Sequence, residues 1–193
     1  MVLTPSTMLP LSTAAPDFSL PNVVSGELVS LADFSDRQAL LVIFMCCHCP
    51  FVKHVQDEFF KIQTDFADQS LGILAISAND VSKYPLDSPE KLKEMAQTLK
   101  YDFPVCYDET QEVSKAYTAA CTPDFFLFDS EKKLVYRGQL DESRPSNGIP
   151  VTGQDLRSAI ASTLDNQSID SNQKPSIGCN IKWIPGNEPE YFG

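Results

Sequence analysis

Residues 40–50 read LLVIFMCCHCP, an apolar run that ends in thiols and a proline. The consecutive apolar residues, with β-branched Val42 and Ile43, predict a strand buried on both faces, as in a parallel sheet. Pro50 suits the first turn of a helix, because its missing N–H would have no intrahelical partner there. Apolar residues then recur at spacings of three and four, which predicts an amphipathic helix with the buried positions Val52, Val55, Phe59, Ile62 and Phe66. The cysteines are therefore predicted to lie at a strand-to-helix turn.

Cys46 and Cys49 form a Cys-x-x-Cys at the start of that helix. Free N–H groups and the helix dipole favour the thiolate there, and the thiolate is the nucleophilic form of cysteine. His48 lies between the two cysteines, and when protonated it is expected to lower a thiol pKa further. We predict that Cys46 and Cys49 are catalytic, with Cys46 as the exposed, low-pKa nucleophile and Cys49 as its more buried partner.

Two other uses of these cysteines are less consistent with the sequence. Inert cysteines rarely cluster at one turn, and residues 46–49 are too contiguous to close a tetrahedral zinc site. The only other histidine is His54, so no second ligand pair lies at zinc spacing. We expect no bound metal and no cofactor beyond the cysteine pair. The non-enzymatic alternative is a binding module, or a carrier of a soft ion such as Cu(I) with Cys46, Cys47 and Cys49 as ligands.

Three segments together resemble one known family. Residues 46–50 resemble the active-site turn of the thioredoxin-fold superfamily, and residues 15–21, APDFSLP, resemble the entry of its peroxiredoxin-related branch. Residues 121–129, CTPDFFLFD, resemble the Thr-Pro of that fold, in which the proline is cis, faces the Cys-x-x-Cys and precedes a strand. Over about residues 12–165 the chain resembles the alkyl hydroperoxide reductase/thiol-specific antioxidant group, or redoxins. The resemblance implies that Thr122 and Pro123 bind substrate, with the backbone before the proline pairing with an incoming disulfide.

The resemblance leaves two enzymatic readings. In the first, Cys46 attacks a disulfide and Cys49 resolves the mixed disulfide. In the second, one thiolate attacks a hydroperoxide. Peroxiredoxins usually carry a Pro and a Thr at fixed positions before the peroxidatic cysteine, but the matching positions hold Val42 and Cys46 when counted from Cys49, and Ala39 and Ile43 when counted from Cys46. We therefore favour thiol–disulfide exchange over peroxidase activity.

The rest of the chain predicts an α/β fold. Residues 71–77 predict a second parallel strand, residues 18–20 and 28–31 an N-terminal β-hairpin, and residues 125–128 and 134–136 a later hairpin. Ser88 and Thr152 are expected to cap two further helices. We predict a thioredoxin-like three-layer sandwich with an N-terminal β-hairpin extension and a C-terminal tail. The expected division is a flexible N-terminus at 1–13, the thioredoxin-like domain at 14–165 and the tail at 166–193.

The tail holds a further cysteine. Residues 165–174 are polar, but residues 175–183 are apolar again and are expected to dock on the domain. Cys179 is thus either part of a structural strap or a resolving thiol carried to the site. Cys121, two residues before Pro123, is also expected near the active-site turn. We rank Cys179 first, Cys121 second and Cys47 last as auxiliary thiols.

Charge and hydropathy restrict the partners. The formal net charge of −11 argues against nucleic acid and anionic membranes, which would repel the chain. No apolar run approaches the length of a membrane span, and the first basic residue is Arg37, so no signal peptide is expected. We expect a cytoplasmic protein, where a Cys-x-x-Cys is more often catalytic than structural. The expected partners are a disulfide-containing protein or small molecule, or a hydroperoxide, together with an external thiol reductant.

Overall fold

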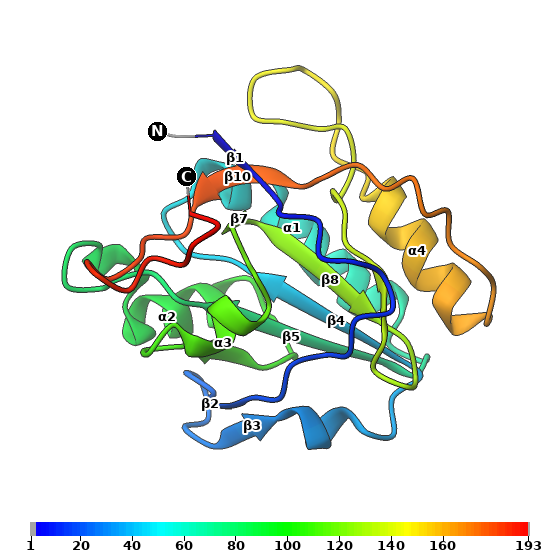
Figure 1. Ribbon diagram of the computed structural model, residues 1–193, viewed down its shortest axis with the longest axis horizontal. Helices are drawn as coiled ribbons and strands as arrows, with labels where there is room; N and C mark the ends of the chain where they lie inside the picture. The colour runs from blue at the N-terminus through cyan, green and yellow to red at the C-terminus, as the bar shows by residue number, and fades with distance from the viewer. Residues whose placement is uncertain (1–2, 193) are drawn as a thin grey trace.

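The computed structural model describes residues 3–192 and is built on a five-stranded mixed sheet (Figure 1). The strand order is β6 (Val105–Tyr107), β5 (Leu71–Ser77), β4 (Ala39–Phe44), β8 (Asp124–Phe128) and β9 (Leu134–Tyr136). The central strand β4 pairs in parallel with β5 and antiparallel with β8, and all of its residues are buried. The predicted strand buried on both faces is confirmed.

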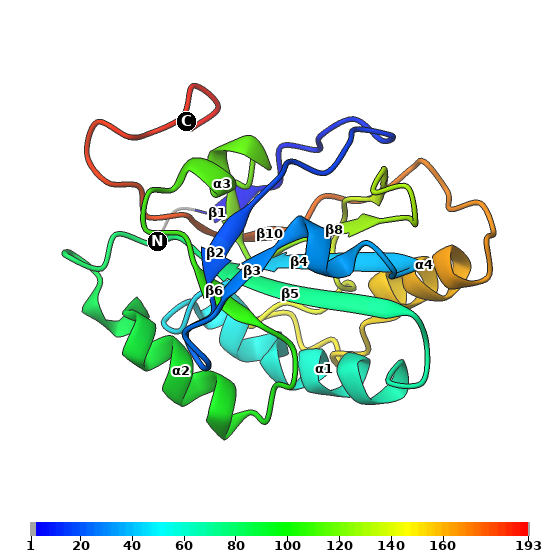
Figure 2. The ribbon, with the colours of Figure 1, turned by 90° about the horizontal axis from the view of Figure 1, so that it is seen from below.

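Two apolar layers enclose this sheet. Helices α1 (Pro50–Asp65), α2 (Pro89–Thr98) and α4 (Gln154–Leu164) share one core with Leu41 and Ile43 of β4. The other face, with Leu40 and Val42, packs against the hairpin β2 (Ser19–Pro21) and β3 (Leu28–Ser30), the short helix η1 (Leu31–Phe34) and the segment after α3 (Glu112–Ala116). Figure 2 shows α1 and α2 on one side of the sheet and α3 on the other. The structure therefore has the predicted three-layer α/β architecture. No helix within residues 3–192 is long and apolar enough to cross a lipid bilayer.

The helix starts agree with the sequence in one case and differ in another. Ser88 caps α2 as predicted, because its hydroxyl accepts the N–H of Lys91. Thr152 does not cap α4; the cap residue is Gly153, in the left-handed conformation with φ +66°. The carboxylate of Asp141 accepts the N–H groups of both Thr152 and Gly153 at 2.7 Å. The Thr152 hydroxyl still accepts the N–H of Gln154 at 3.3 Å, so Thr152 and Asp141 together satisfy donors at the start of the helix.

Both ends of the chain are tied to each other and to the domain. Strand β10 (Ile177–Asn180) pairs antiparallel with β7 (Cys121–Thr122) on one edge and with β1 (Leu3–Pro5) on the other. The predicted docking of the tail is confirmed. The N-terminal segment expected to be flexible instead supplies β1, because the free edge of β10 offers backbone hydrogen bonds that no sequence periodicity reveals. The tail then buries Ile181 and Trp183 in the second core.

Candidate active site

The Cys-x-x-Cys lies where β4 ends and α1 begins. Cys49 is the N-cap of α1, and Pro50 is its first residue, as predicted. Because β4 and β8 run antiparallel with Phe44 opposite Asp124, the start of β8 meets the end of β4. This register brings the Thr122–Pro123 peptide, which is cis as the resemblance implied, against both thiols. The Cys46 Sγ lies 3.5 Å from Thr122 Oγ1, and the Cys49 Sγ lies 3.1 Å from the Thr122 carbonyl oxygen.

Of the auxiliary thiols predicted from the sequence, Cys179 is the one that meets the pair. Its Sγ lies 3.0 Å from the Sγ of Cys49. The Cys121 thiol instead faces two backbone carbonyls, those of Pro123 and Ser176. Cys47 is half-buried, and burial followed by the nearby Asp87 carboxylate raises its pKa to about 12. The structure therefore groups three sulfurs, those of Cys46, Cys49 and Cys179.

The prediction that Cys46 is exposed is wrong. Cys46 is 1% exposed and Cys49 is fully buried. The direction of the pKa shifts is also reversed from the sequence prediction. The pKa of Cys49 is lowered, first by its interaction with the Cys46 thiol and then by polar contacts with Cys179, Thr122 and the backbone of Val52, which together outweigh burial. The pKa of Cys46 is raised by the hydrogen bond to Cys49, by burial and by the Asp87 carboxylate. The two thiols titrate as a coupled pair, and the directions of their shifts favour ionisation of Cys49 before Cys46.

Asp87 organises the turn from the opposite side. Its Oδ1 accepts the backbone N–H groups of Cys47 at 2.8 Å and His48 at 3.1 Å. Its Oδ2 accepts a hydrogen bond from the side-chain amide of Asn79 at 2.7 Å and is also hydrogen-bonded to Nδ1 of His48. Asp87 is fully buried. These contacts fix the backbone between the two cysteines.

The role predicted for His48 changes accordingly. Its ring pairs with the carboxylate of Asp87 and stacks on Tyr84, with ring centroids 5.5 Å apart. The charge that acts on Cys46 is that of Asp87, which raises the thiol pKa where His48 was expected to lower it. Sequence reasoning missed Asp87. The available signal was its position, since it follows the parallel strand β5, whose carboxyl end lies beside that of β4.

The structure brings together one set of three metal-ligand side chains within residues 3–192: Cys46, His48 and Asp87, with ligand atoms within 4.8 Å of one another. Only Cys46 is a thiol, and the side chains of His48 and Asp87 are already hydrogen-bonded to each other. A soft ion prefers several thiolates, so this set fits Cu(I) poorly. The carrier hypothesis named Cys47 and Cys49 as the other ligands, and the structure places neither in the set.

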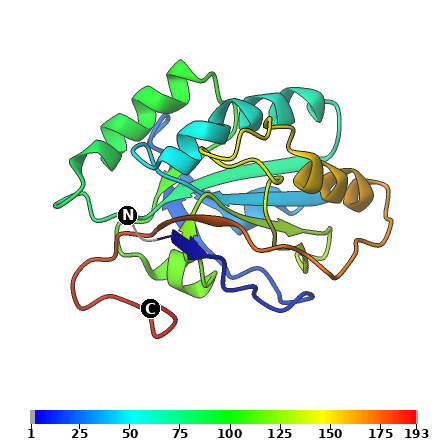
Figure 3. The same cartoon turned by 90° about the horizontal axis from the view of Figure 1, so that it is seen from above.

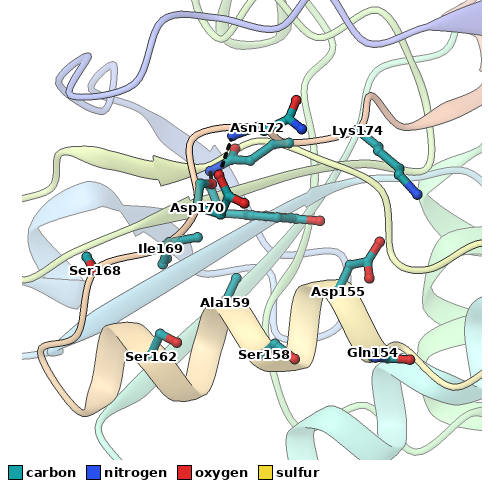
Figure 4. Close-up of a pocket in the computed structure, with 12 residues that line it drawn as sticks. Gln154, Asp155, Ser158, Ala159, Ser162, Ser168, Ile169, Asp170, Asn172 and Lys174 are labelled. Atoms are coloured by element: carbon teal, nitrogen blue, oxygen red, sulfur yellow. Dashed lines mark hydrogen bonds between the residues drawn. The ribbon is translucent and has the colours of Figure 1, made fainter.

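Two cavities lie on different parts of the surface. A cavity of about 320 Å³ between α4 and residues 168–174 contains no thiol among its lining residues (Figure 4). A cavity of about 460 Å³ borders the active-site turn, with Cys47 and His48 on one wall and Leu86 and Met95 on the other. The second cavity reaches the two residues between Cys46 and Cys49, but neither Cys46 nor Cys49 lines it.

Residues 11–137 match the sequence model of the AhpC/TSA family. The chain belongs to the AhpC/TSA family. A protein of Mycobacterium tuberculosis named "Putative peroxiredoxin" is 29% identical over 117 residues, which are 61% of this chain and 69% of the relative. These matches place the cysteine turn and the Thr122–Pro123 peptide inside the part of the chain that carries the family signature.

Solved structures extend the similarity of this AhpC/TSA protein to the tail. An uncharacterized conserved protein from Geobacillus kaustophilus is 52% identical, with a TM-score of 0.94 over 96% of this chain and 98% of that chain. The thioredoxin domain of a thiol-disulfide oxidoreductase from Bacteroides vulgatus is 23% identical, with a TM-score of 0.63 over 81% of this chain and 99% of that domain. The second similarity shows that this AhpC/TSA protein has the thioredoxin fold.

Proposed function

We propose that this protein is a thiol–disulfide oxidoreductase whose redox centre is the pair Cys46 and Cys49. The observation that carries the proposal is the contact of both sulfurs with Thr122, beside the cis proline, and the lowered pKa of Cys49 agrees with it. A thiolate with a neighbouring thiol is the arrangement that disulfide exchange requires. Family membership supports a redox enzyme of this or the peroxidase type.

The interaction between the Cys46 and Cys49 thiols suggests how a proton passes from one to the other. In this mechanism the Cys46 thiol gives its proton to the Cys49 thiolate and attacks one sulfur of a substrate disulfide. A mixed disulfide forms at Cys46, and the other substrate sulfur leaves as a thiolate that takes the proton from Cys49. The Cys49 thiolate then attacks Cys46 Sγ, which forms the Cys46–Cys49 disulfide and releases the second substrate thiolate. Two electrons pass to the substrate, and an external thiol reductant restores the pair.

Cys46 is the substrate-facing thiol in this mechanism because of its neighbours. Cys47 and His48, which follow it, line the cavity of about 460 Å³. Both Cys46 and Cys49 are buried, so the turn has to open at Cys46 for a substrate to reach it. That cavity is largely apolar, with Leu86 and Met95 as walls, so it suits the side chains that flank a disulfide in a peptide.

A thiol peroxidase is the second candidate. The lowered pKa of Cys49 favours it, because a thiolate is the form that attacks the O–O bond of a hydroperoxide. The Mycobacterium tuberculosis relative is named "Putative peroxiredoxin", which also favours a peroxidase. The absence of the usual Pro and Thr before either cysteine argues against it, so we rank it below disulfide exchange.

One comparison tests both candidates. Turnover of oxidised glutathione or of a peptide disulfide is measured beside turnover of hydrogen peroxide, with dithiothreitol as the reductant. We expect faster turnover of the disulfides, and loss of that activity in both Cys46→Ser and Cys49→Ser. Cys106→Ser is the matched control, since Cys106 is equally buried but lies in the other core. Faster turnover of peroxide than of either disulfide would contradict the proposal and support the second candidate.

A further inference from the structure

The chain's own tail occupies the backbone position that the resemblance assigns to a substrate. Cys179 of β10 lies directly opposite Thr122 in the antiparallel β10–β7 pair. On its other edge β10 pairs with β1, where Leu3 is opposite Cys179. Figure 3 shows the C-terminal segment running beside the N-terminal strand. Cys179 is therefore held in a fixed register against the active-site turn, and is not carried on a free arm.

The closeness of β10 to the cis proline depends on a glycine. A Cβ on Gly178 would lie 2.0 Å from the carbonyl oxygen of Thr122, so no larger residue fits unless the strand moves away. Ser176 adds a second attachment, because its hydroxyl donates to the Pro123 carbonyl at 2.9 Å. The sequence around Cys179 is thus built to hold the strand in contact with Thr122 and Pro123.

We propose that Cys179 is a third redox thiol that exchanges disulfides with Cys49. The inference rests on the proposed function, which supplies the Cys46–Cys49 disulfide. Cys49 adjoins both other sulfurs, because it shares the turn and the Thr122 contact with Cys46 and its Sγ lies 3.0 Å from that of Cys179. The distance compares with about 2.05 Å for a disulfide bond, so a small side-chain movement joins the two sulfurs.

The exchange needs no further oxidant. The Cys179 thiolate attacks Cys49 Sγ, the Cys49–Cys179 bond forms, and the Cys46–Cys49 bond breaks. Cys46 leaves as a thiolate and takes up the proton that Cys179 lost, so the protein stays oxidised by the same two electrons. The product ties β10 covalently to the start of α1. The oxidised tail is then locked over Thr122, while Cys46 is again free to react.

Disulfide mapping tests this inference. The reduced full-length protein is treated with a small excess of oxidised dithiothreitol, quenched in acid, alkylated and digested without reduction, and the linked peptides are identified by mass spectrometry. We expect both Cys46–Cys49 and Cys49–Cys179 in the wild type. We expect only Cys49–Cys179 in the Cys46→Ser variant and only Cys46–Cys49 in the Cys179→Ser variant.

Two further variants separate proximity from chemistry. Gly178→Ala should keep Cys46–Cys49 but lose Cys49–Cys179, because its Cβ pushes β10 away from Thr122. Cys121→Ser is the control, since Cys121 is buried in the neighbouring strand without facing Cys49, and it should retain both disulfides. The inference alone would be overturned if the wild type turns over disulfides and forms Cys46–Cys49, while Cys49–Cys179 is found neither in the wild type nor in Cys46→Ser. The absence of both turnover and the Cys46–Cys49 bond would overturn the proposed function as well.

Discussion

Replacing Asp87 with alanine should be the most damaging single change near the active-site turn. The substitution removes the acceptor of three N–H donors: the backbones of Cys47 and His48 and the side-chain amide of Asn79. A buried donor left without a partner costs about 1–3 kcal/mol. Three such donors would cost about 3–9 kcal/mol, but removal of a buried carboxylate also recovers several kcal/mol of desolvation. Since Cys47 and His48 are only half-buried, water can reach part of the turn, and we expect a loss of about 3–4 kcal/mol.

The matched variant Asp87→Asn separates the hydrogen bonds from the charge. It keeps an oxygen for the two backbone donors, so we expect a loss of about 1–2 kcal/mol. It also removes the carboxylate that raises the pKa values of Cys46 and Cys47, so both thiols should ionise at lower pH. Urea denaturation of the reduced protein measures the stability, and the ultraviolet absorbance of the thiolate against pH measures the ionisation. A loss below about 1 kcal/mol in Asp87→Ala, or an unchanged thiol titration in Asp87→Asn, would refute this account of the turn.

Two other substitutions test the electrostatics of the buried groups. Reduced wild-type protein should show thiolate absorbance at about pH 7 that Cys49→Ser loses and Cys106→Ser keeps, because the pKa of Cys49 is lowered while burial raises that of Cys106 to about 12. Arg137→Met should cost about 3–5 kcal/mol, since it leaves the fully buried Asp124 without its partner at 3.4 Å. Burial raises the pKa of Asp124, so its contribution to stability is present at low pH and is lost as the pH rises through the folded-state pKa. The loss in Arg137→Met should therefore be larger at about pH 7 than at about pH 4, and denaturation at both pH values checks this; an equal loss would argue against the pairing.

The strand, the turn and the helix of the active site could be predicted because their signals are local. An apolar run long enough for one strand specifies β4, and the spacing of three and four specifies α1. The contact of that turn with Thr122 and Pro123 is not local, since Thr122 lies 76 positions after Cys46 in the sequence. It was reached through the family resemblance, and the antiparallel register of β4 and β8 supplies its physical cause.

The residues that sequence reasoning missed or misjudged depend on tertiary contacts. Asp87 ends the short 3-10 helix η2 (Pro85–Asp87) and looks in the sequence like an ordinary turn residue, and its role appears only because β5 lies beside β4. The strand β1 has no periodic pattern and forms because β10 presents a free edge. Cys179 is 130 residues from Cys49, so the sequence could suggest a contact but not decide between a structural strap and a redox thiol.

The reversed order of the two thiol pKa values has the same origin. The helix-terminus argument treats each cysteine alone and favours the one nearest the exposed turn. In the folded protein the two cysteines titrate as a coupled pair, so the polar contacts of each sulfur decide which one ionises first. Cys46 and, across 3.0 Å, Cys179 both contribute to the lowered pKa of Cys49, so the docked tail itself influences which thiol ionises first. Because Gly178 sets the distance of β10 from Thr122, the same glycine that permits exchange in the oxidised protein also supports the Cys49 thiolate in the reduced one.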